Sequence, residues 1–132
     1  MIVGFNIEAI MADKGHGGNG DIQVNYQPEI KSVEKDTVSA LDEPVARINY
    51  EFSVNYMAGE EKAAHITMTG HVFWKGDVEE ITEAWEEDNE IPDKVEVPLM
   101  NEMYKKLLSE SVGVADTLNL LPPIPTPKIN QQ

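Results

Sequence analysis

The sequence predicts an α+β fold in which a four-stranded antiparallel sheet carries two helices packed on one face. Apolar and polar residues alternate with a period of two in four stretches before residue 75, and the period then changes to about 3.6. Strands followed by helices are typical of this class, because the helices bury the apolar face of the sheet. The 132 residues have room for one domain, with a sheet at 1–76, two helices at 77–116 and an extended, proline-rich tail at 117–132.

The four strands are predicted from their alternation. Residues 3–11 place apolar side chains at odd positions and residues 22–30 at even positions. Pro28 indicates an edge strand or a bulge, because proline has no amide hydrogen to donate. The clearest alternation covers residues 48–56 and returns over residues 64–74, after a short turn that contains glycine. These two stretches predict a hairpin.

Two further segments are predicted to be connections. Residues 15–20 contain four glycines and predict a mobile hairpin loop between the first two strands. Their glycine content is similar to that of a phosphate-binding loop, but such a loop precedes a helix, and here a strand is expected to follow. Residues 34–44 are polar and acidic without any period, which indicates a second connection.

The two helices are predicted from stripes of apolar residues. The first has Val78, Ile81 and Trp85 on one stripe, Asp88 is expected to mark its end, and Asp77 is placed to cap its free amides. The second begins between Asp93 and Pro98, since proline is tolerated in a first turn, and Gly113 is expected to mark its end.

Charge excludes several classes of partner. The chain has 24 acidic and 10 basic residues, for a formal net charge of −14, and Arg47 is its one arginine. Nucleic acids and anionic membranes are therefore unfavourable partners. No apolar run approaches the ~20 residues that span a bilayer, so membrane insertion is not expected. The N-terminus has no basic region before an apolar one, which leads us to expect a cytoplasmic protein.

No constellation of residues predicts catalysis, a metal site or a cofactor site. The chain has no cysteine. His65 and His71 share a strand face, but six residues at about 3.4 Å each separate them by ~20 Å, too far for one ion. His16 has no carboxylate at a suitable spacing, and the acidic run of residues 79–88 is expected on a solvated helix face. The sequence also lacks the Gly-x-Ser-x-Gly motif, in which a strained turn exposes a nucleophilic serine. We therefore expect a protein that is not an enzyme.

The sequence also carries more apolar surface than one small subunit is expected to bury. Phe73 has the parity opposite to Val72 and Trp74, so the fourth strand is apolar on both faces. Trp85 lies on a short helix, and the tail is rich in leucine and proline. Either a subunit interface or the tail covers this surface, and grooves left open in an oligomer would bind partners.

Short motifs in a fixed order resemble those of the SecB family of protein-export chaperones. Residues 26–31 (YQPEIK) are similar to its signature of an aromatic residue, Gln-Pro-Glu, an aliphatic residue and Lys. Residues 48–73 resemble its central hairpin, residues 97–99 the start of its long helix, and residues 118–120 its closing segment. The resemblance covers residues 5–127.

The resemblance implies one SecB-like domain with a Greek-key sheet, assembled as a homotetramer that is a dimer of dimers. It implies ATP-independent holding of unfolded or precursor polypeptides in apolar grooves before export, with clients that carry basic flanks favoured by the charge of the chain. By the same resemblance, the client-binding residues are Tyr26, Ile30, Val33, Trp74, Ile81 and Trp85.

The chain departs from the family pattern at two places. Residues 32–35 interrupt the family's alternation of aliphatic and acidic residues, which affects the lining of the groove and the register of the strand. Ile66 or Thr67 stands where the family places its acidic contact for the export motor SecA, which argues against docking to that translocase component. Two other functions stay open: a module dedicated to one partner, such as an antitoxin, and a small-ligand binding domain with a pocket between sheet and helix.

Overall fold

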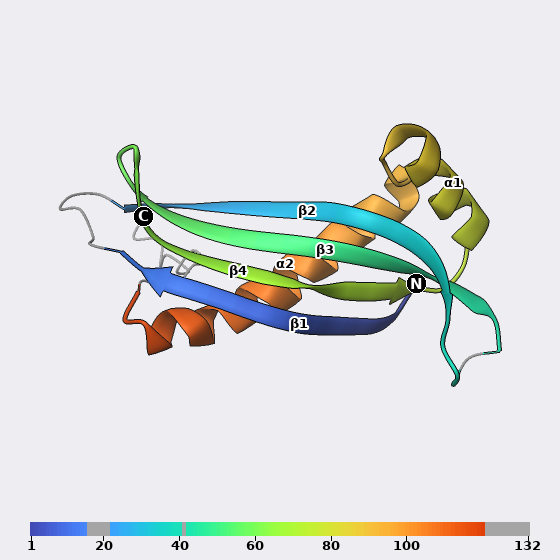
Figure 1. Ribbon diagram of the computed structural model, residues 1–132, viewed down its shortest axis with the longest axis horizontal. Helices are drawn as coiled ribbons and strands as arrows, with labels where there is room; N and C mark the ends of the chain where they lie inside the picture. Colours follow the sequence, from blue (N-terminus) through green and yellow to red (C-terminus); the bar gives the residue numbers. More distant parts are fainter. Residues whose placement is uncertain (16–21, 41, 121–132) are drawn as a thin grey trace, which may run out of the picture.

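The computed structural model describes residues 1–15, 22–40 and 42–120, and it has the α+β architecture that the sequence predicts. Figure 1 shows four long strands and two helices. Their bounds are β1 Ile2–Lys14, β2 Ile22–Thr37, β3 Pro44–Ala58, β4 Glu61–Trp74, α1 Val78–Asp88 and α2 Asp93–Thr117. β2 continues to Thr37, so the connection expected from residue 34 was placed too early.

The strands form one antiparallel sheet in the order β1-β4-β3-β2. Three consecutive strands are neighbours and β1 lies beside β4, which is a Greek key. The hairpin expected between β1 and β2 is therefore wrong, because these strands lie at opposite edges of the sheet. The expected mobility of this connection concerns residues 16–21, which lie outside the described residues. The β3–β4 hairpin is confirmed, with Ala58 opposite Glu61 and Gly59 at a φ of +67°.

Irregularities in both edge strands change which side chains face the core. The register of β1 shifts between Ile7 and Ala9, so that Ile10 pairs with the core-facing Met68 and Met11 with Thr67 on the other face. The odd-numbered pattern expected for this strand therefore ends at Ile7. β2 shifts between Ile30 and Ser32 in the same way. An extra residue in one strand reverses the parity of all residues that follow it.

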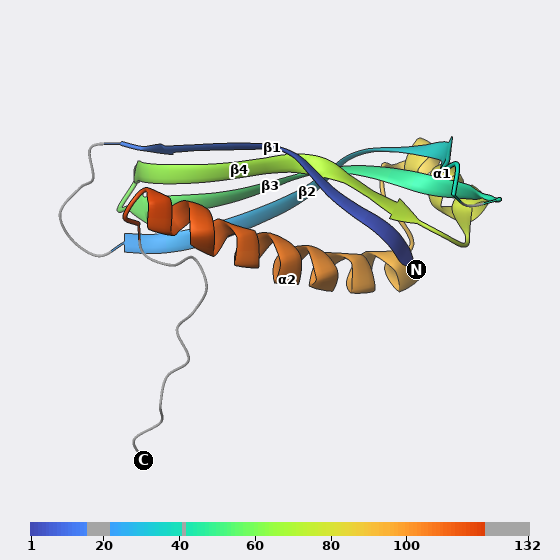
Figure 2. The same ribbon diagram turned by 90° about the horizontal axis from the view of Figure 1, so that it is seen from below.

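The core lies between the sheet and the helices. The even-numbered side chains of β3 from Ala46 to Tyr56 are all at most 2% exposed. Leu99, Met103 and Leu107 of α2 are fully buried against them, and Phe52 meets Tyr104 edge to face at 5.9 Å. Figure 2 shows α2 lying along one face of the sheet. Side chains of α1 belong to the same core cluster, so both helices contribute to the core.

The structure differs from the predictions made for two helix ends, at Asp77 and at Gly113. Asp77 has a left-handed backbone at φ 54° and makes no side-chain cap bond, so the predicted capping by Asp77 is wrong; its carboxylate lies 3.8 Å from Lys94 Nζ instead. α2 continues through Gly113 to Thr117, which makes Gly113 an internal residue. The helix ends in a Schellman motif: Asn119 has a φ of +57°, Leu120 N donates to Ala115 O and Asn119 N donates to Asp116 O.

Candidate functional site

The long helix leaves part of the sheet without helical cover. In Figure 1, α2 crosses behind the sheet diagonally, from the side of β2 near α1 to the side of β1 at the opposite end. The N-terminal half of β2 is not crossed by it. The core-facing side chains of β2 there are half-buried, whereas those of the neighbouring β3 are buried. We call this row of half-buried residues the apolar strip: Ile22, Val24, Tyr26, Pro28 and Ile30.

A pocket of about 180 Å³ lies at the end of the apolar strip where β2 begins. Its apolar walls come from the strands that meet there and from the end of α2. We call this the end pocket; its lining residues are Lys14, Gly15, Ile22, Tyr56, Ala63, Asn119 and Leu120. Ile22 belongs to both features, so the strip and the pocket form one continuous apolar surface.

The six side chains predicted to bind clients do not lie together in one place. Tyr26 and Ile30 lie in the apolar strip. Val33 lies beyond the β2 bulge and shares a second, polar pocket with α1. Val33 follows Tyr26 by seven positions, which correspond to ~24 Å along a strand, so one short segment in contact with Tyr26 would not reach α1.

Two of the other predicted residues belong to the core. Ile81 is fully buried and Trp74 is 8% exposed, which leaves little of either side chain accessible. Trp85 lies on α1 and is half-buried, as Tyr26 and Ile30 are on β2. The structure thus adds Ile22, Val24 and the end pocket to the site. The alternating pattern of β2 already contained the signal for the first two, but no sequence pattern indicated where α2 ends against the sheet.

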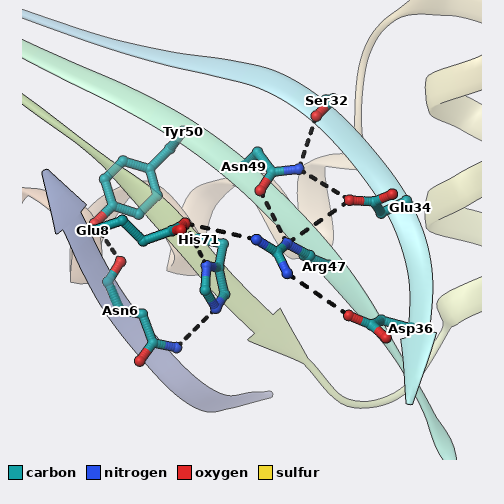
Figure 3. Close-up of polar contacts among 9 residues, drawn as sticks. All are labelled: Asn6, Glu8, Ser32, Glu34, Asp36, Arg47, Asn49, Tyr50 and His71. Carbon is teal, nitrogen blue, oxygen red and sulfur yellow. Dashed lines mark hydrogen bonds and ion pairs between the residues drawn. The ribbon is translucent and has the colours of Figure 1, made fainter. Parts of the chain in front are cut away.

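The opposite face of the sheet carries a polar network, shown in Figure 3. Arg47 reaches three carboxylates, at 3.7 Å from Glu8, 3.8 Å from Glu34 and 3.9 Å from Asp36. Its Nε also donates to the Asn49 side chain at 3.2 Å. The one arginine is therefore surrounded by acidic groups from both edge strands, which leaves it poorly placed to bind an external anion.

Histidine side chains connect β1 to β4 on the same face. His71 Nδ1 lies 2.7 Å from Glu8 Oε1, and Asn6 Nδ2 lies 3.1 Å from His71 Nε2. An imidazole with its proton on Nδ1 satisfies both contacts. The hydrogen bond with His71 is the main cause that lowers the pKa of Glu8 below its usual range.

A separate histidine pair lies further along β1. His65 Nδ1 is 3.1 Å from Asp13, so the two strand histidines have different acidic partners. Within residues 1–15, 22–40 and 42–120, no three metal-ligating side chains gather in one place. His65 and His71 each connect β4 to an acidic side chain of β1.

Tyr50 completes the attachment of β1. Its hydroxyl donates to Asn6 O at 2.8 Å, and its ring packs on Phe5 with 5.5 Å between centroids. Burial raises the pKa of Tyr50 far above its usual value, so the hydroxyl stays protonated and donates. The bond needs Gly70, because a Cβ there would lie 2.7 Å from the Tyr50 hydroxyl and 2.0 Å from Asn6 O.

The ends of the sheet differ in polarity. The pocket between α1 and β2 is lined mostly by polar and acidic groups, and Lys35 there pairs with Glu79. The end pocket at the opposite end is apolar. An apolar ligand or segment is therefore better accommodated at the end where β2 begins.

Comparison of the chain with models of protein families, with curated proteins and with solved structures finds no match. The described helices include none with the length and apolar character that crossing a bilayer requires. The fold and the site thus define the class of an α+β protein with a partly uncovered, apolar sheet face, and the function is proposed from that geometry.

Proposed function

We propose that the protein is a cytoplasmic, SecB-like holdase that binds non-native polypeptides, including export precursors, along the apolar strip. The observation that carries this proposal is the continuous apolar surface formed by the strip and the end pocket. The Greek-key order and the long helix on one face agree with the arrangement that the resemblance of the sequence to SecB implies. Binding along the strip requires neither ATP nor a cofactor, and docking to SecA is not part of the proposal.

The strip is suited to extended apolar segments. From Ile22 to Ile30 it is ~27 Å long, which matches about eight residues of an extended chain. Burial of one tyrosine-sized side chain contributes roughly 1.5–3 kcal/mol, so a few contacts give measurable affinity without selecting one sequence. The net charge of −14 adds attraction for segments with basic flanks.

Light scattering of several unrelated refolding proteins tests the proposal. We expect the chain, in stoichiometric amounts, to suppress aggregation of all of them. Protection of a single cognate protein would indicate a module dedicated to one partner, and no protection at any ratio would refute chaperone action.

A pair of neighbouring substitutions tests the location of the site. Tyr26→Glu places a charge in the strip, and Gln27→Glu places the same charge on the exposed opposite face of the same strand. We expect the first variant to bind clients about tenfold more weakly, which corresponds to about 1.4 kcal/mol of binding free energy, and the second to bind them unchanged. Equal effects of the two variants would place the site elsewhere. Thermal unfolding of both variants controls for stability.

The two edge strands of the sheet, β1 and β2, differ in their suitability for contact with another copy of the chain. On β1, Ile10 is 45% and Met11 is 67% exposed, and the two side chains lie on opposite faces. β2 has Pro28 and two lysines along its edge, which protect an edge from pairing with another chain. We therefore propose that copies of the chain meet at β1 and that two such dimers form the tetramer.

Sedimentation velocity tests the assembly. Met11→Lys should shift the protein toward a smaller species, whereas Gln23→Lys on the edge of β2 should not. An unchanged sedimentation coefficient in Met11→Lys would exclude β1 as the contact, and a monomeric native chain would refute the oligomer.

A further inference from the structure

The C-terminal end of the described chain lies in the end pocket. The Schellman motif fixes the backbone there, with Leu120 N bonded to Ala115 O at 2.8 Å. Leu120 and Asn119 both line the pocket. The next residues of the sequence, 121–132, thus start at the pocket where the apolar strip begins.

The chemistry of residues 121–127 fits that surface. This segment, Leu-Pro-Pro-Ile-Pro-Thr-Pro, contains no charged residue, and the first charge after it is Lys128. Four prolines restrict the unbound segment to extended conformations, which lowers the entropy lost on docking. At ~3.1 Å per residue, seven such residues reach about 22 Å, nearly the ~27 Å from Ile22 to Ile30.

We propose that residues 121–127 lie along the apolar strip of their own chain, starting from the end pocket. The segment is joined directly to a pocket residue, so its effective concentration at the strip is high without a separate linker. It covers Ile22, Val24 and Tyr26. The consequence for regulation rests on the proposed function: the segment competes with non-native chains for the strip, and a client must displace it.

Paramagnetic broadening tests the docking in the full chain. Since the chain has no cysteine, Lys128→Cys allows one nitroxide label at a single position. We expect the label to broaden the backbone NMR signals near Tyr26 and Ile30 selectively, and we expect Ile124→Asp in the same chain to abolish this broadening. Weak broadening over the whole surface that Ile124→Asp leaves unchanged would overturn the proposal.

A mixing experiment identifies the chain that supplies the segment. Isotope-labelled protein without nitroxide is mixed with nitroxide-labelled protein at natural isotope abundance. Selective broadening that persists in this mixture, in proportion to the fraction of nitroxide-labelled chains, would show that a second copy occupies the strip, which overturns docking within one chain. Loss of the broadening supports the proposal.

Client affinity tests the competition. If the segment occupies the strip for nine-tenths of the time, Ile124→Asp should strengthen client binding about tenfold. Ile129→Asp, which lies beyond the docked residues, should leave it unchanged. Unchanged affinity in Ile124→Asp, with clients still bound, would overturn the competition. If neither the native chain nor the variants bind clients while the broadening is selective, the proposed function fails and the docking stands.

Discussion

Replacement of Gly70 by alanine should separate β1 from the rest of the sheet. Gly70 is buried in β4 opposite Ile7 of β1 and Tyr50 of β3. An added Cβ would lie 2.0 Å from the backbone oxygen of Asn6, whereas ordinary contacts begin near 3.4 Å. Because that oxygen belongs to the backbone of the neighbouring strand, no side-chain rotation can relieve the overlap, and β1 must move.

Two contributions set the magnitude of the effect. Overpacking of a filled site costs about 1–3 kcal/mol. Movement of Asn6 also breaks the 2.8 Å bond from the buried Tyr50 hydroxyl, and a buried donor without its partner costs about 1–3 kcal/mol. We therefore expect Gly70→Ala to lower the free energy of unfolding by about 3 kcal/mol. With an m value of about 1.5 kcal/mol/M, the urea midpoint falls by about 2 M.

Urea unfolding followed by circular dichroism measures the effect. Gly113→Ala is the matched control, because a Cβ at this helical position meets nothing within 4 Å. It should stabilise the chain by about 0.5–1 kcal/mol. In a Tyr50→Phe background, Gly70→Ala should still cost about 2 kcal/mol, since the overlap with Asn6 remains. A Gly70→Ala midpoint equal to that of the native chain would refute the close approach of β1 and β4.

Other predictions concern the polar network. Because the folded-state pKa of Glu8 is lowered, its ionised form stabilises the protein above the unfolded value of about 4.3, and this contribution is lost as the pH falls through the lowered pKa. Glu8→Gln should therefore lose less stability than the native chain between pH 6 and pH 3; equal losses in urea midpoint would contradict the pairing with His71. Arg47→Met leaves three carboxylates near one another and should destabilise the chain by about 1 kcal/mol at low salt, and by less at 0.5 M salt, where screening weakens their repulsion. A salt-independent difference in urea midpoint would show that packing, rather than charge, is affected.

The sequence predicted the parts of the fold that depend on regular periodicity. The alternation from Ile48 to Tyr56 corresponds to β3, and the helical stripe of Val78, Ile81 and Trp85 lies in α1. Alternation cannot reveal a bulge, because the polar Glu8 fits either face; for this reason Met11 was placed on the wrong face of β1. Gly113 was predicted to end α2 because glycine is common at helix ends. The helix continues past it, since Ala115 is fully buried in the core, and Asn119 is the residue with the left-handed backbone at the helix end.

The candidate site was predicted less completely, since it depends on distances between elements. Tyr26 and Ile30 are accessible in the strip, while Ile81 is buried although it lies on a short helix with an acidic surface. Burial of a helical residue depends on the angle at which its helix meets the sheet, which no local pattern specifies.

The uncovered corner of the sheet follows from the lengths of the elements. Strands of 13–16 residues extend about 44–54 Å at 3.4 Å per residue, whereas the 25 residues of α2 extend only about 38 Å. A helix about 10 Å wide that crosses diagonally therefore leaves two opposite corners of the sheet open. β1 closes one of them, because Met1 exchanges backbone hydrogen bonds with Lys75 and lies with Trp74 and Pro98 around one pocket. The other corner is the start of the apolar strip. The lengths of the elements, rather than any one side chain, leave this corner without helical cover. A substitution such as Tyr26→Glu therefore changes the chemistry of the strip without covering it. Weaker client binding in that variant would thus report on direct contact between client and strip.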